Sequence, residues 1–360
     1  MAENILIVHL VSNGDCLMAT TLARQIKSDY PECQLTWAVS FKCKQVLLNN
    51  PYIDEIWEIN YSDQDSPIEN VWNNLKEEIK TRNYSQVHYT QIFPDNELFY
   101  DGTTRSTTFN VYPNKITVPV QPIIRLFENE IDAVKKFVSK FQLDKYEHKI
   151  IFECTPSSGQ SEMNLEIAIS ISEILTRKIE SLIVVISTHV NFESPNDRIV
   201  NGSELSFREN AELSNYCSFL IGCSSGISWL LTSDWSKKLP TLQILNGEAY
   251  GFSFASISYD FKYWNLNTDH IIETDIIDTN EISELVLDAL VNFENAKKYH
   301  HKIFKPNYNY VLDQMVNYLV LKEYAKIFIQ YKKFSLRNNK WVELFYRFIV
   351  KLFKILTRKK

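Results

Sequence analysis

Short apolar runs rich in β-branched residues alternate with segments of helical periodicity along most of this chain. The runs "NILIVHLV" (4–11) and "SLIVVIS" (181–187) carry apolar residues without a polar alternation. Such a strand must be covered on both of its faces, which is the situation in the parallel sheets of α/β proteins. Strands of this kind separated by helices predict βαβ units.

The alternation runs through the chain twice, with an amphipathic helix expected at 127–142 between the two series. We therefore predict an α/β fold with two doubly wound, Rossmann-like domains that face a cleft, followed by a helical tail. A length of 360 residues suits two hydrophobic cores. The expected divisions are an N-terminal Rossmann-like domain at 1–125, a connector at 126–147, a second Rossmann-like domain at 148–290, and C-terminal helices at 291–360.

Charge and cysteine content narrow the class of protein. The formal net charge is −6, but residues 337–360 hold eight basic residues and one acid, against 30 basic and 43 acidic residues elsewhere. A body this acidic argues against nucleic-acid binding. The six cysteines are scattered, without zinc-site spacing. The N-terminus lacks the pattern of a signal peptide. We expect a cytoplasmic protein.

Five of only eight glycines fall at or just beyond expected strand ends, where ligands bind in open α/β sheets. Glycine there permits close backbone approach, although strand-to-helix turns also use it. Two loops share this design, "ECTPSSGQSEM" (153–163) and "IGCSSGISWL" (221–230). Their hydroxyl and N–H groups are suited to a diphosphate at a helix N-terminus, and the alternative is a capped turn. The five glycines are Gly14, Gly159, Gly222, Gly226 and Gly247.

Other familiar site patterns are missing from the sequence. There is no G-x-G-x-x-G fingerprint, no P-loop and no G-x-S-x-G elbow. Asp63-Gln64-Asp65 forms a D-x-D triplet, but it lies among Ser and Asn residues and we interpret it as a solvated loop. We assign no metal and no cofactor. His189 follows a strand end, where it either contacts a ligand or belongs to a surface loop.

Three stretches resemble the ADP-heptose:lipopolysaccharide heptosyltransferases and together span about residues 4–250. The resemblance implies the GT-B fold and transfer of a sugar from a nucleotide sugar, with Asp15 as the general base. From spacing alone, a helix N-cap is the preferred interpretation of Asp15. We expect the transfer to be metal-independent, because helix N-termini can supply the positive partners of the diphosphate. The stretches are "ILIVHLVSNGDCLMATTLARQIKSDYPECQLTWAV", "NNPYIDEIWEI" and "AELSNYCSFLIGCSSGISWLLTSDWSKKLPTLQIL".

The second half of the resemblance is degraded. Ser224 stands where the family has an acid and Trp229 where it has a histidine, while Ser161-Glu162 replace a usual Lys or Arg. A donor other than ADP-heptose, or an inactive relative, therefore stays open. The expected donor-binding residues are Thr155, Ser157, Ser158, Gly159, Gln160, His189, Ser224, Ser225, Gly226 and Ile227, and those on the acceptor side are Ser12, Asn13 and Gly14.

The segment 340–358 predicts an amphipathic helix. Its polar residues recur every three or four positions, and nearly everything between them is apolar. A charge on every turn argues against a membrane-spanning helix and favours one lying in the plane of an anionic membrane surface. The alternative is a helix that packs on the body or mediates dimers. The polar positions are Lys340, Glu343, Arg347, Lys351, Lys354 and Arg358.

Together these observations lead us to expect a cytoplasmic glycosyltransferase at the inner face of the membrane. Its partners would be a nucleotide sugar, a glycolipid or surface-polysaccharide acceptor, as in lipopolysaccharide biosynthesis, and an anionic membrane surface contacted by residues 337–360. The alternatives are a GT-B sugar-nucleotide epimerase and a catalytically inactive nucleotide- or glycan-binding protein.

Overall fold

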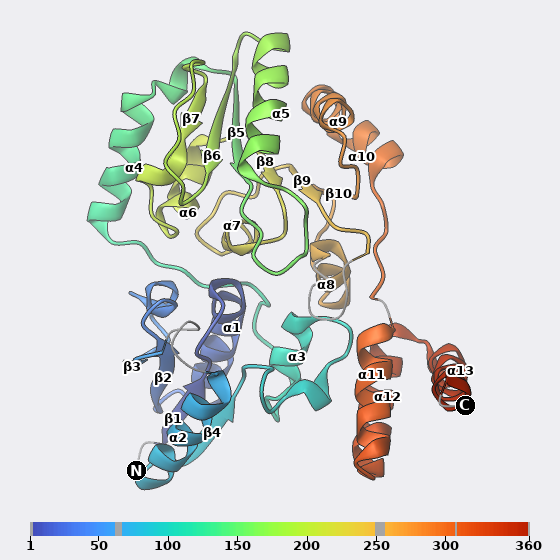
Figure 1. Cartoon of the computed structure of the whole chain (residues 1–360). Coiled ribbons are helices and arrows are strands. Elements are labelled where there is room, and N and C mark those ends of the chain that lie inside the picture. Colours follow the sequence, from blue (N-terminus) through green and yellow to red (C-terminus); the bar gives the residue numbers. More distant parts are fainter. Residues whose placement is uncertain (1–2, 62–66, 249–255, 307, 359–360) are drawn as a thin grey trace.

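The computed structural model describes residues 3–61, 67–248, 256–306 and 308–358. Two parallel sheets, each flanked by helices, lie one above the other, and a group of three C-terminal helices lies beside the first of them (Figure 1). This arrangement confirms the predicted α/β fold with two Rossmann-like units and a helical tail.

The first sheet has four parallel strands in the order β3-β2-β1-β4. Its central strand β1 is buried from Ile5 to Val8, as its uninterrupted apolar run requires. The elements are β1 (Asn4–Val8), α1 (Asn13–Asp29), β2 (Gln34–Ser40), η1 (Lys44–Leu47), β3 (Glu55–Ile59), α2 (Ile68–Thr81), β4 (Gln86–Tyr89), η2 (Glu97–Phe99) and α3 (Thr104–Asn110).

The second sheet has six parallel strands in the order β10-β9-β8-β5-β6-β7. The connector helix α4 (Glu128–Lys140) precedes it. The other elements are η3 (Leu143–Lys145), β5 (His148–Glu153), α5 (Leu165–Lys178), β6 (Leu182–Ser187), β7 (Ile199–Asn201), η4 (Gly202–Glu204), α6 (Glu209–Leu213), η5 (Ser214–Tyr216), β8 (Phe219–Gly222), α7 (Gly226–Leu230), β9 (Thr241–Ile244), α8 (Ile257–Tyr263), β10 (Ile271–Thr274), α9 (Thr279–Val291) and α10 (Phe293–His300).

Both sheets are wound in the same way. The first strand of each, β1 or β5, lies inside the sheet, so that the chain builds outward on one side and then crosses to the other. The crossing points lie between β1 and β4 and between β5 and β8. In such sheets the crevice at the carboxyl ends of the strands, beside the crossing point, is where ligands bind.

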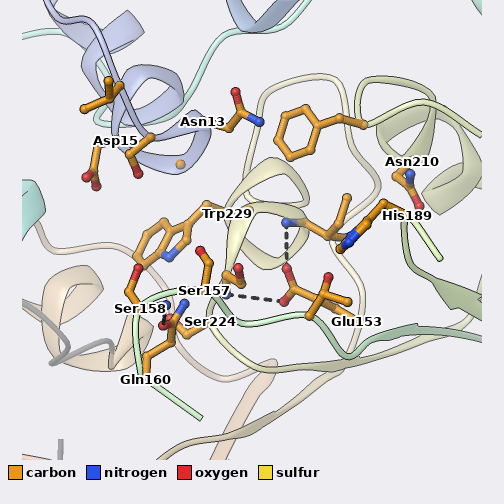
Figure 2. Close-up of a pocket in the computed structure, with 18 of the residues that line it drawn as sticks. Asn13, Asp15, Glu153, Ser157, Ser158, Gln160, His189, Asn210, Ser224 and Trp229 are labelled. Atoms are coloured by element: carbon orange, nitrogen blue, oxygen red, sulfur yellow. Dashed lines mark hydrogen bonds between the residues drawn. The ribbon is translucent and has the colours of Figure 1, made fainter. Parts of the chain in front are cut away.

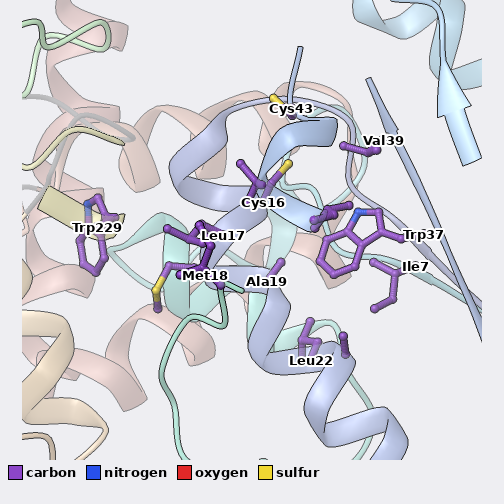
Figure 3. Close-up of a cluster of buried hydrophobic side chains, with 14 of the residues drawn as sticks. Ile7, Cys16, Leu17, Met18, Ala19, Leu22, Trp37, Val39, Cys43 and Trp229 are labelled. Carbon is purple, nitrogen blue, oxygen red and sulfur yellow. The ribbon is translucent and has the colours of Figure 1, made fainter. Parts of the chain in front are cut away.

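Helix α1 joins the two units. Its Cys16, Leu17 and Met18 belong to a hydrophobic cluster that begins on the first sheet and continues to Trp229 and Leu230 of α7 in the second unit. Figure 3 shows Trp229 beside Leu17 and Met18, with Trp37 on the far side of the cluster. The start of α1 and the start of α7 are therefore held close together by shared apolar packing.

The C-terminal helices are α11 (Asn309–Val320), α12 (Tyr324–Asn338) and α13 (Trp341–Arg358). Leu344 and Phe348 of α13 are buried against α11 and α12, so part of its apolar face packs inside the protein. The other part stays exposed, with Phe345 57% and Phe353 64% accessible. The chain contains no helix, among the residues described, that is long and apolar enough to cross a membrane.

Buried Arg208, at the start of α6 in the second unit, forms hydrogen bonds with both the connector and the first unit. Its guanidinium donates to both carboxylate oxygens of Glu130 on α4, at 2.6 and 2.9 Å, and to the carbonyl oxygens of Gln45 and Leu48 in the first unit, at 2.9 and 3.1 Å. Burial raises the pKa of Glu130, but the hydrogen bonds and charge of Arg208 outweigh burial and leave this pKa below its ordinary value. The pair therefore stabilises the fold at neutral pH.

We expect Arg208→Met to lower the free energy of unfolding by about 3–5 kcal/mol, because it leaves a largely buried carboxylate without its partner. A carboxyl group with a depressed folded-state pKa stabilises the protein above its unfolded pKa, and this contribution is lost as the pH falls through the folded value. Urea titrations should therefore show the difference from wild type shrinking below pH 4.5. A difference that does not change with pH would contradict this account.

Candidate functional site

A cavity of about 850 Å³ lies at the carboxyl ends of the strands, between the two units. It is lined by residues that follow β1, β4, β5, β6 and β8, so it includes the crossing points of both sheets. Figure 2 shows Asn13 and Asp15 on one side of it, with Ser157, Ser158, Gln160, Ser224 and His189 on the other. Two loops far apart in the sequence thus face the start of α1 across one space.

The structure brings the expected site residues together. Every predicted donor-side and acceptor-side residue lines the cavity except Gly159. Gly159 lies in the same loop, where a φ of 71° explains the glycine. Gly222 and Gly247 are not among the described residues that line the cavity. A Cβ at Gly222 would lie 2.3 Å from Ser228 Oγ and one at Gly247 2.5 Å from Asp275 Oδ2, which explains both by packing.

Asp15 lies in the first turn of α1 and borders the cavity. The N-cap of that helix is Ser12, so the alternative of Asp15 as N-cap is wrong. Burial raises the pKa of Asp15 above 3.8, whereas the charge of Arg105 and a hydrogen bond from Ser12 oppose the rise. A carboxylate in this setting is a stronger base than one in water.

Two serines at the cavity have left-handed backbone conformations. Ser12, before α1, has a φ of 71°, and Ser224, before α7, has a φ of 50°. A residue with a side chain is rarely found there, and the conformation costs free energy. Strain of this kind often marks a ligand site, and here it occurs in both loops that face each other across the cavity.

The contacts of Glu153 show that the second loop, at 221–230, differs from our expectation. Its buried carboxylate accepts hydrogen bonds from the N–H groups of Ile227 at 2.7 Å and Ser228 at 3.2 Å, and from Ser228 Oγ at 2.5 Å (Figure 2). These are N–H groups of the first turn of α7, which we expected to hold a diphosphate. The expectation is wrong for these two amides, because a carboxylate of the protein already occupies them.

The first loop differs from expectation as well. Helix α5 begins at Leu165, and Asn164 is its N-cap, accepting from the Ile167 N–H at 3.0 Å. Residues 157–160 therefore precede the helix and do not form its N-terminus. Within the loop, the N–H of Ser158 donates to the Gln160 side chain at 2.8 Å. The loop offers Thr155, Ser157 and Ser158 hydroxyl groups to the cavity, without a helix dipole behind them.

Several lining residues were not predicted. Arg105 lies on α3 in a segment whose sequence, "DGTTRSTTFN", has no clear periodicity, so no pattern pointed to it. Its guanidinium stacks on the indole of Trp229, with the carbon Cζ 3.8 Å from the ring centre. Glu153 did leave a signal, since it is an acid that ends an otherwise apolar strand, "KIIFE".

Metal ligands do not gather anywhere in the described part of the chain: it contains no group of three His, Cys, Asp or Glu side chains that could hold an ion. Asp63 and Asp65, the D-x-D triplet, lie outside the described residues. The six cysteines are free thiols, and all are buried.

No protein-family model and no curated protein matches the chain. Solved structures do resemble it. A glycosyl transferase family 9 protein of Veillonella parvula has a TM-score of 0.54 and 15% identity, over 82% of this chain and 93% of that one. A Listeria monocytogenes protein assigned as a UDP-N-acetylglucosamine 2-epimerase has a TM-score of 0.52 and 10% identity, over 85% of this chain and 92% of that one. The Escherichia coli heptosyltransferase WaaC with ADP has a TM-score of 0.47 and 10% identity, over 79% of this chain and 99% of that one.

At these identities the likeness shows the fold alone. The two structures with TM-scores above 0.5 cover most of both chains, so the protein has the two-unit GT-B fold. One of them is described as a glycosyl transferase and the other as an epimerase, so the fold does not choose between these activities.

We expect Glu153→Ala to lower the free energy of unfolding by about 1.5–3 kcal/mol, because the N–H groups of Ile227 and Ser228 lose a charged acceptor. Added sulfate should then restore part of the loss, since an anion can take the vacated place. Calorimetry with and without sulfate measures this. Glu162→Ala, an exposed acid in the neighbouring loop, is the control and should change little. A sulfate effect equal to that on wild type would count against an anion site at α7.

Proposed function

We propose that this protein is a glycosyltransferase that moves a sugar, of heptose type or another, from a nucleotide-diphosphate donor to an acceptor hydroxyl. The observation that supports it most is the position of Asp15. Its carboxylate lies on the α1 side of a single cavity, and the hydroxyl-rich loops after β5 and β8 lie on the other side. A base on one side and a donor site on the other is the arrangement that transfer needs.

In this mechanism Asp15 takes the proton of the acceptor hydroxyl. The acceptor oxygen bonds to the anomeric carbon as the bond between that carbon and the donor diphosphate breaks, and the diphosphate leaves with the electron pair. A positioned base contributes about 10²–10⁴-fold to such a step. We propose that this step proceeds without a metal ion.

The acceptor would enter on the side of the first unit. Asn13 lines the cavity there, and its Oδ1 is buried without a hydrogen-bond partner in the described part of the chain. A buried amide oxygen without a partner is costly, and a sugar hydroxyl would satisfy it. His9 and Gln91 line the same region, and burial lowers the pKa of His9 to about 3, so its ring is neutral.

The exposed part of α13 fits an acceptor held in a membrane. Val342, Phe345, Tyr346 and Phe353 are 57–83% accessible, in a segment that is strongly basic. Basic residues near anionic headgroups contribute about 1 kcal/mol each, and inserted apolar side chains add to this. Lys340 and Arg347 pair with Glu343, which reduces the charge available to lipids. We propose a peripheral, cytoplasmic-face enzyme that acts on a glycolipid or surface polysaccharide.

A sugar-nucleotide epimerase is the second candidate, because the Listeria protein assigned to that activity resembles the fold about as well as the glycosyl transferase does. Incubation with a panel of nucleotide sugars, followed by NMR, separates the two. Transfer or hydrolysis releases a nucleoside diphosphate, whereas epimerisation returns a changed nucleotide sugar. A protein that binds a donor without converting it would be an inactive relative.

We expect Asp15→Asn to lower kcat by about 10²–10⁴-fold while donor affinity and melting temperature stay nearly constant, because the amide keeps the shape but cannot take a proton. Asp29→Asn, at the far end of α1, is the control. Because the pKa of Asp15 is raised, activity should be lost in acid at a pH above the ordinary carboxyl range. Full turnover by Asp15→Asn would contradict its role as base.

For the tail, we expect the double variant Phe345→Ser/Phe353→Ser to bind anionic vesicles at least tenfold more weakly, since burying each ring contributes about 1.5–3 kcal/mol. Both side chains are exposed, so the fold should persist. Val291→Ser, which alters an 88% exposed residue at the end of α9, should leave vesicle binding unchanged. Sedimentation with anionic and with neutral vesicles tests this. Equal binding by all variants would refute membrane contact through α13.

A further inference from the structure

The cavity holds few positive charges for a site that would bind a diphosphate. Among its described lining residues are two carboxylates, Asp15 and Glu153, and a single Lys or Arg side chain, Arg105. The loops after β5 and β8, at 154–164 and 223–226, contain no Lys or Arg at all. The amides of Ile227 and Ser228 are already bonded to Glu153. Among the described residues, the donor side of the cavity therefore has no Lys or Arg of its own.

Arg105 comes from the other unit and is held rigidly. Its Nε donates to Asp260 Oδ2 on α8 at 2.6 Å, and its guanidinium lies over the Trp229 ring. The side chain is only 7% accessible. A guanidinium fixed at one edge and one face is oriented before a ligand arrives, which is what effective charge stabilisation requires.

Arg105 does not have the carboxylate of Asp260 to itself. Arg337 of α12 also pairs with Asp260, through Nη2 and Oδ1 at 3.0 Å, so two guanidinium groups share one carboxylate. Of the two arginines, only Arg105 lines the 850 Å³ cavity. Arginine also presents several N–H donors in a plane, a geometry that matches phosphate oxygens.

We propose that Arg105 is the cationic residue that binds the donor diphosphate and stabilises it as it leaves, an inference that rests on the proposed function. When the bond from the anomeric carbon to the diphosphate oxygen breaks, that oxygen keeps the electron pair and gains negative charge. The guanidinium of Arg105 stabilises this negative charge, while Asp15 accepts the proton of the acceptor hydroxyl. One side chain of the first unit thus replaces the positive charge that the donor loops lack.

The test is isothermal titration of the full-length protein with ADP, UDP, GDP and the corresponding monophosphates. We expect wild type to bind one of these diphosphates at least tenfold more tightly than its monophosphate. Arg105→Met should abolish that difference by weakening the diphosphate alone, with monophosphate binding changed by less than about threefold. Arg125→Met removes an arginine that pairs with Asp234 away from the cavity, and it should keep the diphosphate preference.

Arg105→Lys provides a second measurement that does not depend on folding of the Met variant. It retains the charge but not the planar donor set, so the diphosphate preference should fall several-fold. An unchanged preference in a folded Arg105→Met, or in Arg105→Lys where the Met variant fails to fold, would overturn the role of Arg105 and leave the proposed function standing. If no nucleotide in the panel binds wild type, the proposed function fails and this inference fails with it.

Discussion

The carboxylate of Asp260 is the interaction on which the arrangement of this protein depends. It is 2% exposed and is held by Arg105 of the first unit and Arg337 of the C-terminal helices, while its own helix, α8, belongs to the second unit. Three parts of the chain therefore meet at one buried acid. Losing one partner of a buried ion pair costs about 3–5 kcal/mol, because the remaining charge is left without compensation. The parts are consequently fixed against one another, and Asn338 adds to this by donating to the Asp101 carbonyl at 2.9 Å.

This fixed arrangement explains how the cavity is shared. Trp229 of the second unit is held between Arg105, which stacks on it, and Gly14, where an added Cβ would lie 3.8 Å from its ring. The start of α1 thereby stays opposite the start of α7, and the carboxyl ends of both sheets open into one space. The carboxylate of Glu153, which belongs to the second unit itself, offsets the partial positive charge at the N-terminus of α7. A bound anion in this cavity would depend on the first unit for its positive charge, which links the two units in function as well as in structure.

Patterns in the sequence predict the fold and the positions of the loops, but they do not predict the contacts between distant segments. Buried strands such as β1 and β6 can be predicted, because a short apolar run has few other structures available. The topology of a parallel sheet then places the residues that follow these strands close together. Arg105 and Asp260 are 155 positions apart, and neither lies in a periodic segment, so nothing local links them. Likewise, the pattern of α13 predicts a helix with a wide apolar face. It cannot tell that Leu344 and Phe348 are covered by α11 and α12 while Phe345 and Phe353 are not.

The choice between transfer and epimerisation depends on what lies beyond the donor. Both reactions begin with a nucleotide sugar, so a cation such as Arg105 near the diphosphate would serve either one. Only transfer needs a second substrate, and two features suit one. The buried Oδ1 of Asn13 lacks a partner among the described residues on the acceptor side, and α13 exposes aromatic side chains beside basic ones. An epimerase, which returns its substrate to solution, would gain nothing from the membrane contact that we propose for α13. These features agree with the proposed transferase and with the membrane-held acceptor that we propose for it.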